Sequence, residues 1–298
     1  MTRFRVPATS ANLGPGFDCL GLALSIYDEF EITPAETLSL DGVEPRFQSP
    51  DNLLVRAYEE GMRAAGASGS LHAAFDCSIP VSRGLGSSAA LITAGIAAAS
   101  VLHGNALSRD RIFALASRME GHPDNAAPCV YGGLTACLKR SDGSYRMEQL
   151  PFSSRIHLTV LIPSVEVSTE AARKILPDSY PRAAAAGNAA HALLMARALE
   201  TGDFALLKDA ADDQLHEPYR SQLIPGFHMI RRIAAADTGG VLVISGSGST
   251  CLLLSPGPLS ERAAAEIQGV EGGWRIQEAQ AAPLGAAYLE EGVWHPII

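Results

Sequence analysis

The segment from Leu71 to Leu102 constrains the fold of this chain more than any other part of its sequence. Apolar residues alternate with more polar ones from Leu71 to Ile79, which predicts a half-buried strand. The sequence SRGLGSSAAL follows at residues 82–91. From Ser88 to Leu102 the residues are small and apolar on every side, which predicts a buried helix. A strand, a glycine loop and a helix therefore follow one another directly.

A glycine-rich turn that leads into a helix can bind a phosphate group. It exposes consecutive backbone N–H groups, and the start of the helix adds roughly half a positive charge. Gly84 and Gly86 let a ligand approach the backbone, while Ser87 and Ser88 offer hydroxyl groups to phosphate oxygens or to Mg²⁺. The loop is not a P-loop, because serine instead of lysine follows Gly86. From these residues alone, a tight structural turn and a phosphate-binding site are equally compatible with the sequence.

The charge balance limits what such a loop can bind. The chain of 298 residues has 23 basic and 32 acidic side chains, a formal net charge of -9, and no basic run that would attract a nucleic acid. An acidic protein that binds a nucleotide must neutralise the phosphates locally, with backbone N–H groups, a few arginines and a metal ion. No nucleic-acid partner is expected.

The cysteines and the apolar segments bear on location. The five cysteines are odd in number and never spaced as C-x-x-C, which argues against a disulfide framework and a zinc site. Residues 1–12 lack the apolar core of a signal peptide, and the most apolar stretch, Leu91–Leu102, is too short to span a bilayer. We therefore expect a cytoplasmic protein with no membrane partner.

The remaining patterns predict two halves of mixed α and β structure. The interval 141–155 is the most polar and turn-rich, so we expect one domain at residues 1–150 and a second at residues 151–298. Strands are predicted at 3–6, 71–79, 134–139 and 156–162, with two more joined by a turn within 239–255. Helices are predicted at 52–65 with Asp51 as N-cap, 88–102, 109–120, 168–176, 182–200, 203–215, from about 223, and at 260–267.

Several motifs resemble those of a known enzyme superfamily. PATSANLGPGFD at 7–18, GLGSSAA at 84–90 and SGSGST at 245–250 resemble the three motifs of the GHMP small-molecule kinases. Within that superfamily, EGHPDN at 120–125, STEAAR at 168–173, HEPYR at 216–220 and the lysine-free opening motif are similar to the homoserine kinase family. The resemblance spans nearly the whole chain.

This resemblance implies both a fold and an activity. The fold would be α+β with two domains, an N-terminal half like domain 2 of ribosomal protein S5 and a ferredoxin-like C-terminal half. The activity would be the ATP-dependent phosphorylation of L-homoserine to O-phospho-L-homoserine in threonine biosynthesis, with Mg²⁺ as the metal. Two alternatives stay open: another GHMP-family alcohol kinase, or a non-catalytic nucleotide-binding regulator on the same fold. A homodimer is expected, because two-fold dimers are the commonest soluble assemblies.

The resemblance also implies which residues bind the amino acid substrate. Asn12 and Asp18 match the catalytic pair beside the substrate hydroxyl, where Asp18 would position the alcohol first and act as a base only in second place. Arg173 and Arg220 match two carboxylate-binding arginines, whose planar fork suits that group. His122 matches a substrate-binding histidine. Without the motifs, we would interpret the two arginines as surface residues and the histidine as a loop residue that caps backbone groups.

Metal and nucleotide sites are implied in the same way. Ser88 and Glu120 would hold Mg²⁺, although a glutamate at a helix end is otherwise more often a surface charge. Asn125 stands where other members of the superfamily have a catalytic aspartate, which favours a mechanism without a base. The expected ATP-binding residues are Asn52, Leu53, Pro80, Val81, Ser82, Arg83, Gly84, Leu85, Gly86, Ser87, Ser88, Ala89, Ala90, Ser245, Gly246, Ser247 and Gly248.

Overall fold

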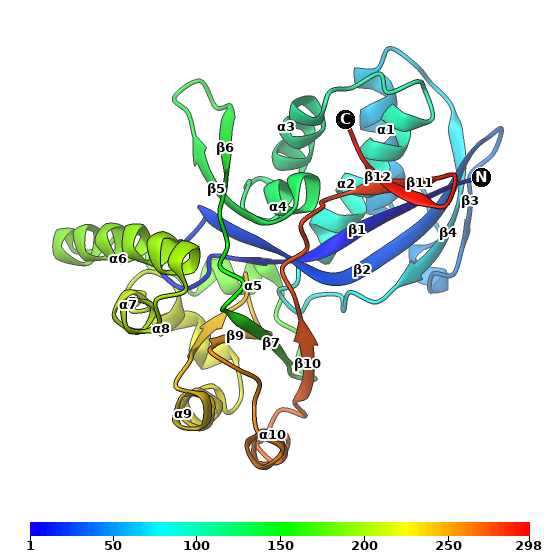
Figure 1. Cartoon of the computed structure of the whole chain (residues 1–298). Helices are drawn as coiled ribbons and strands as arrows, with labels where there is room; N and C mark the ends of the chain where they lie inside the picture. The colour runs from blue at the N-terminus through cyan, green and yellow to red at the C-terminus, as the bar shows by residue number, and fades with distance from the viewer.

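Two β-sheets organise the chain, and the computed structural model describes residues 1–298 (Figure 1). The first sheet runs in the order β12 (Val293–Pro296), β11 (Ala287–Glu290), β1 (Thr2–Ala11), β2 (Leu20–Ala35), β4 (Ser70–Cys77) and β3 (Ser39–Asp41), with β5 (Leu134–Lys139) paired to β2 and β6 (Tyr145–Leu150) paired to β5. The second sheet runs in the order β10 (Arg275–Ala279), β7 (His157–Ile162), β9 (Cys251–Ser255) and β8 (Val241–Ile244). Every neighbouring pair in this second sheet is antiparallel. If its strands are numbered along the chain, their order in the sheet is 4-1-3-2, which is the ferredoxin-like arrangement.

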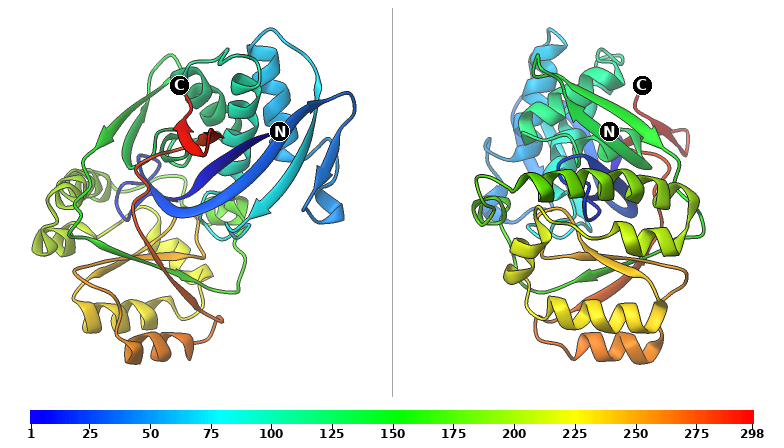
Figure 2. Two further views of the ribbon diagram at one scale, coloured as in Figure 1. Left: turned by 45° about the vertical axis from the view of Figure 1, so that its right-hand side comes forward. Right: turned by 90° about the vertical axis from the view of Figure 1, so that its left-hand side faces the viewer.

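Helices cover each sheet. The first sheet carries α1 (Leu53–Ala64), α2 (Ser87–Val101), α3 (Arg109–Glu120) and α4 (Ala126–Tyr131), and α2 and α4 pack directly on β1 and β2. Figure 2 shows α9 (Phe227–Thr238) and α10 (Glu261–Gln268) side by side beneath the second sheet. Between β7 and α9 lie α5 (Thr169–Lys174), α6 (Arg182–Thr201), α7 (Phe204–Ala210) and α8 (Glu217–Arg220), and short 3-10 turns form at Pro45–Phe47 and Ser221–Leu223.

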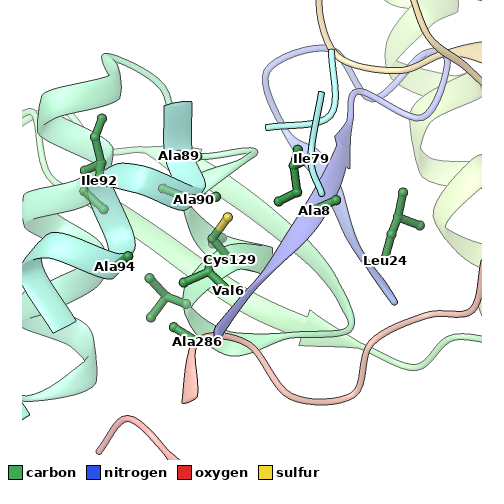
Figure 3. Packing of buried hydrophobic residues seen from close by; sticks show 14 of the residues in the cluster. Val6, Ala8, Leu24, Ile79, Ala89, Ala90, Ile92, Ala94, Cys129 and Ala286 are labelled. Atoms are coloured by element: carbon green, nitrogen blue, oxygen red, sulfur yellow. The ribbon is translucent and has the colours of Figure 1, made fainter. Parts of the chain in front are cut away.

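Helix α2 lies at the centre of the first half, as its small apolar residues predict. Nearly every residue from Ala89 to Ser100 is buried, and Ala89 and Ala90 share one apolar cluster with Val6 and Cys129 (Figure 3). A Cβ on Gly95 would lie 2.3 Å from the carbonyl oxygen of Leu54 in α1. The backbones of α1 and α2 are therefore in direct contact where the helices cross, and only glycine at position 95 permits this approach.

The ends of several elements differ from the sequence-based expectations. The N-cap of α1 is Asn52 and not Asp51, because the Asn52 side chain accepts the N–H of Leu54 at 2.9 Å. Helix α7 ends at Ala210, well before the predicted end at 215, where Asp213 instead accepts backbone N–H groups of the following turn. Helix α9 begins at Phe227, since Pro225 and Gly226 interrupt the pattern that starts near 223.

The last strands belong to the first sheet. β11 pairs antiparallel with β1, with Phe4 opposite Tyr288, so this C-terminal strand lies beside the first strand of the chain (Figure 1). The sequence places these residues in the second domain, because a strand pattern carries no information about its pairing partner. The polar interval after residue 140 also contains β6, which forms a hairpin with β5.

None of the helices combines the length and the hydropathy that a transmembrane segment requires. All five cysteines are free thiols. The absence of a disulfide framework agrees with the spacing of the cysteines in the sequence.

Asp28 is a buried carboxylate that supports the start of the glycine loop. Its Oδ1 accepts the N–H groups of Ser78 and Ile79, both at 2.8 Å, and the residue is only 1% exposed. Burial raises the pKa of Asp28 to about 6, despite these two hydrogen bonds, which oppose the shift.

Replacing Asp28 by asparagine should change the pH dependence of stability. The folded state holds a proton on Asp28 that the unfolded chain releases between about pH 4 and 6, so wild-type stability falls as the pH rises through that window. The amide of the variant does not titrate. The free energy of unfolding of D28N minus that of the wild type should therefore be about 2 kcal/mol larger at pH 7.5 than at pH 4.5 by urea denaturation. An equal difference at both pH values would contradict a raised pKa.

Candidate functional site

A cavity of about 580 Å³ lies between the two halves. Its walls come from the loop after β1, the glycine loop, the start of α2, the end of α3, α5, α8 and the turn after β8. The sequence-predicted residues that line it are Asn12, Asp18, Asn52, Leu53, Val81, Ser82, Arg83, Gly84, Leu85, Gly86, Ser87, Ser88, Ala89, Glu120, His122, Arg173, Arg220, Gly246 and Ser247. Four predicted residues do not line it: Pro80, Ala90, Ser245 and Gly248.

The glycine loop presents a row of free backbone donors to this cavity. No backbone N–H from Gly84 to Ala89 has an acceptor within the protein, and the first bond of this helix is donated by Ala90 to the Gly86 carbonyl oxygen. Gly86 is the left-handed N-cap of α2, with φ of 70°. Free N–H groups and the positive end of the helix dipole act at the same place, so the loop is suited to an anion.

The turn at residues 245–250 supports the loop from behind. The Ser245 hydroxyl donates to the Gly84 carbonyl oxygen at 2.6 Å, and the N–H of Thr250 donates to the carbonyl oxygen of Arg83 at 3.0 Å. A Cβ on Gly84 would lie 2.2 Å from the Ser245 carbonyl oxygen. Ser245 therefore contributes to the site by holding the loop, and not as part of the cavity wall.

Ser88 and Glu120 meet at one edge of the cavity. The Ser88 hydroxyl, in the first turn of α2, donates to Oε1 of Glu120, the last residue of α3. Burial raises the pKa of Glu120, against the opposing effects of the Ser88 hydrogen bond and of His122. No group of three or more His, Cys, Asp or Glu side chains forms a metal-binding cluster. Two oxygen donors suit an ion such as Mg²⁺ that keeps water and phosphate as its other ligands.

His122 is fixed by two carboxylates. Its Nδ1 lies 2.6 Å from Oδ1 of Asp124, and its Nε2 lies 3.6 Å from Oε2 of Glu120. Burial by itself would lower the pKa of His122, but the hydrogen bond and charge of Asp124, with the charge of Glu120, raise it. Asp124 lines the cavity and is 2% exposed. Asp124 is not among the sequence-predicted residues, although a carboxylate two residues after a candidate histidine is a usable signal.

Asn12 and Asp18 line the cavity from the loop between β1 and β2. Both have positive φ, 71° and 52°, which Asn and Asp tolerate better than most residues. Asn12 holds the loop closed, because its Oδ1 accepts the N–H of Asp18 at 3.0 Å and its Nδ2 donates to the Gly246 carbonyl oxygen at 2.8 Å. Asp18 keeps a partly exposed carboxylate in the cavity.

The two predicted arginines converge on the same space. Nη2 of Arg173 lies 3.2 Å from Oδ1 of Asp18. Arg220 is 3% exposed, and its Nε and Nη1 donate to the carbonyl oxygens of Ala172 and Gly246 at 3.1 and 2.9 Å. Burial, followed by the charge of Arg173, lowers the pKa of the Arg220 guanidinium. Both guanidinium groups line the same cavity, and that of Arg220 has no carboxylate partner within the protein. This arrangement favours a ligand that carries a carboxylate.

The guanidinium group of Arg83 forms its contacts with other residues of the protein. Its Nε donates to the Pro163 carbonyl oxygen at 3.1 Å and its Nη2 to the Ser164 carbonyl oxygen at 2.8 Å, while Nη1 lies 3.2 Å from Oε1 of Glu166. The group therefore contacts the C-terminal half, although Arg83 also lines the cavity. The sequence offers no signal for this, since the acceptors are backbone atoms about eighty residues away.

The far end of the cavity is more apolar. Asn52 caps α1 and also donates from Nδ2 to the Phe47 carbonyl oxygen at 3.0 Å, and it lies near the walls formed by Val43, Phe47, Phe75 and Ile79. No sequence pattern distinguishes these apolar residues from core residues, so the sequence analysis did not find them. Asn125 also lines the cavity, and its Oδ1 accepts the Thr9 hydroxyl at 2.7 Å.

Comparison with known proteins identifies the chain's relatives. The families GHMP kinases N terminal domain and GHMP kinases C terminal match residues 52–133 and 195–270. The chain is 39% identical to a homoserine kinase of Microchaete diplosiphon over 88% of both chains, and 36% identical to one of Clostridium botulinum (strain Okra / Type B1) over 96% of this chain and 97% of the relative. The crystal structure of homoserine kinase from Cytophaga hutchinsonii superposes with a TM-score of 0.83 over 97% of both chains, at 27% identity. These similarities confirm the predicted two-domain α+β fold.

Replacing Gly84 by alanine should destabilise the protein more than the same change at an open glycine. Gly84 and Gly66 have nearly equal positive φ, +75° and +70°, but a Cβ on Gly66 meets nothing within 4 Å. Overlap with the Ser245 carbonyl oxygen should cost G84A about 2 kcal/mol more than G66A. Urea denaturation of both variants measures the difference, and equal losses would show that the loop and the turn are not in backbone contact.

Proposed function

The chain belongs to the homoserine kinase family of the GHMP kinases, and from this premise we infer that it transfers the γ-phosphoryl group of ATP to the hydroxyl oxygen of L-homoserine, a step of threonine biosynthesis. The observation that carries the proposal is that a row of free N–H groups and a pair of arginines face the same cavity. The first suits a polyphosphate and the second suits the carboxylate of an amino acid.

ATP would lie along the glycine loop. The phosphates would accept hydrogen bonds from the N–H groups of residues 84–89, which lack other acceptors. The base would occupy the end of the cavity lined by Val43, Phe47 and Phe75, next to Asn52 and Leu53. Pro80, Ala90, Ser245 and Gly248 would then support the site without lining it.

Homoserine would lie between the two arginines and the loop after β1. Its carboxylate would bind Arg220 and Arg173, and its ammonium group would replace Arg173 as the partner of Asp18. Asn12 would help to orient the hydroxyl group, since only one of its Nδ2 hydrogens is used by Gly246. His122 would be a further polar contact, held in place by Asp124.

The chemistry needs alignment more than covalent assistance. The hydroxyl oxygen forms a bond to the γ-phosphorus while the bond from that phosphorus to the β–γ bridging oxygen breaks, which gives ADP, O-phospho-L-homoserine and a proton. In a loose transition state the hydroxyl loses its proton late, so Asp18 acts first by positioning the alcohol and then as an available acceptor. The N–H row stabilises the charge that develops on the phosphate oxygens.

Ser88 and Glu120 would hold Mg²⁺, and their adjoining oxygens fit such an ion. When bound, the ion supplies charge neutralisation for the phosphates that the acidic protein lacks. Glu120 is placed for this by the end of α3, where Gly121 terminates the helix with φ of 85°.

Another GHMP alcohol kinase and a non-catalytic nucleotide-binding regulator are the competing functions. An assay of ADP release over homoserine, shikimate, mevalonate and galactose, with and without Mg²⁺, separates the three. Homoserine should give the highest kcat/KM, and only with the metal present. A different preferred alcohol would support the first alternative, and nucleotide binding without turnover would support the second.

Homodimerisation and a cytoplasmic location stay predictions of this proposal. Helix α6 exposes Leu193 and Leu194 among alanines, with exposed fractions of 72% and 43%. Such a face is compatible with a second copy of the chain. Light scattering at micromolar concentration measures the oligomeric state.

Replacing Arg220 by alanine should weaken homoserine binding selectively. A charge-assisted hydrogen bond to a carboxylate contributes about 1.5–3 kcal/mol, so KM for homoserine should rise by roughly 10- to 150-fold. KM for ATP should change by less than about three-fold, since the proposal assigns the phosphates to the N–H row and not to Arg220. R232A, an exposed arginine on α9, is the control. A parallel rise of both KM values would contradict the assignment of Arg220 to the amino acid.

Replacing Glu120 by glutamine should raise the Mg²⁺ concentration required for half-maximal activity by about ten-fold or more, because the amide removes the charge but keeps the shape. S88A should have a smaller effect in the same direction. E166Q, which changes the exposed carboxylate that pairs with Arg83, is the control. Titrations of activity against free Mg²⁺ at fixed ATP measure these values, and an unchanged requirement in E120Q would exclude Glu120 as a ligand.

A further inference from the structure

The segment from Pro163 to Arg173 connects the two ligand positions of the proposed function. It leaves the second sheet after β7, passes the glycine loop, and ends in α5 with the arginine that faces Asp18. Ala172 is the only buried residue of α5, so apolar packing does little to fix this helix. Its position must come largely from polar contacts at its two ends.

The first of these ends is attached to the glycine loop. The Arg83 guanidinium donates to the carbonyl oxygens of Pro163 and Ser164, and the N–H of Val167 donates to the Ser82 carbonyl oxygen at 3.2 Å. The Arg83 side chain is 16% exposed, whereas that of its ion-pair partner Glu166 is 70% exposed. The hydrogen bonds from Arg83 to the carbonyl oxygens are therefore largely shielded from solvent, whereas the exposed ion pair contributes little to the stability of this contact.

The other end is attached to the amino acid site. The Ser168 hydroxyl caps α5 by accepting the N–H of Ala171 at 3.1 Å, and the Ala172 carbonyl oxygen accepts the Nε of Arg220 at 3.1 Å. Thr169 and Arg173 line the cavity. Within eleven residues, one segment thus contacts the loop that would hold the phosphates and carries a group that would hold the homoserine carboxylate.

We propose that Arg83 is a positioning residue that couples the two substrates: nucleotide bound at residues 84–89 fixes the loop, the Arg83 contacts to the Pro163 and Ser164 carbonyl oxygens fix the start of this segment, and Arg173 is thereby held where homoserine binds. The proposal rests on the proposed function, because it assigns the two ligands to these positions. Homoserine should accordingly bind more tightly to the nucleotide-loaded protein, and nucleotide more tightly to the homoserine-loaded protein by the same factor.

Calorimetric titrations test this coupling with a non-hydrolysable ATP analogue and Mg²⁺. Kd for homoserine is measured with and without the analogue, and the ratio of the two values is the coupling factor. The wild type should show a factor within the range of about 5–150 that is typical of linked sites. R83A should show a factor close to one. R83K should be intermediate, since an ammonium group is compact and lacks the fork that spans two carbonyl oxygens.

Two further variants separate coupling from general damage. E166A removes only the exposed ion pair and should keep the wild-type factor, and K174A alters α5 without touching the attachment and should keep it also. Thermal unfolding of each variant shows whether it is folded, and if R83A is not, R83M retains the aliphatic stem and makes the same test.

The failures of the two claims are distinguishable. A wild type that binds the analogue but not homoserine contradicts the proposed function, and so overturns the coupling that rests on it. A wild-type factor retained in a folded R83A overturns the role of Arg83 and leaves the function standing. Loss of analogue affinity by about ten-fold or more in R83A, with the factor unchanged, would make Arg83 a phosphate ligand and would also overturn the proposal.

Discussion

The site depends on a row of backbone N–H groups that the fold leaves without acceptors. Leaving such donors unpaired and dry would cost about 1–3 kcal/mol each, so the glycine loop has to lie at a surface where water or an anion reaches it. Its donors converge on one ligand only when the loop is held in place. The helical end of the loop is held by α2, whose small residues let the helix sit against α1 and β1 at close range, with Gly95 against the Leu54 carbonyl oxygen. An alanine-rich core thus serves the geometry of the anion site.

The charges in the cavity are consistent with the proposal that a metal ion binds together with the nucleotide. Arg173 and Arg220 bring positive charge, while Asp18, Glu120 and Asp124 bring carboxylates to the same walls. These groups are already partly paired, Arg173 with Asp18 and His122 with Asp124. The helix N-terminus supplies only about half a unit of charge. A triphosphate would therefore remain under-neutralised by the protein alone, and a divalent ion beside Ser88 and Glu120 would supply the missing charge.

The sequence predicted the centre of each half better than the contacts between the halves. Local periodicity located α2, α3 and β5 to within a residue or two, because the pattern that forms a helix or strand is contained in the segment itself. The motif residues of the cavity were also found, since they lie in short recognisable segments. The return of β11 to β1 was missed, and so was the partner of Arg83, because both are decided by residues distant in sequence. The sequence could have predicted Asp124 as a residue of the cavity, because it lies two residues after His122. It could not have predicted Val43 and Phe75, because their pattern is the same as that of core residues.

The contacts between the halves also restrict how substrates can enter. The loop residues Ser82, Arg83 and Gly84 each give a carbonyl oxygen to a donor from the C-terminal half, and Arg83 adds its side chain. Separation of the halves would break all of these bonds at once and would remove the support behind the row of N–H groups that we propose as the phosphate site. Ligands therefore have to enter through the open mouth of a preformed cavity, and any adjustment on binding falls to the weakly buried helix α5 instead of to a hinge between domains.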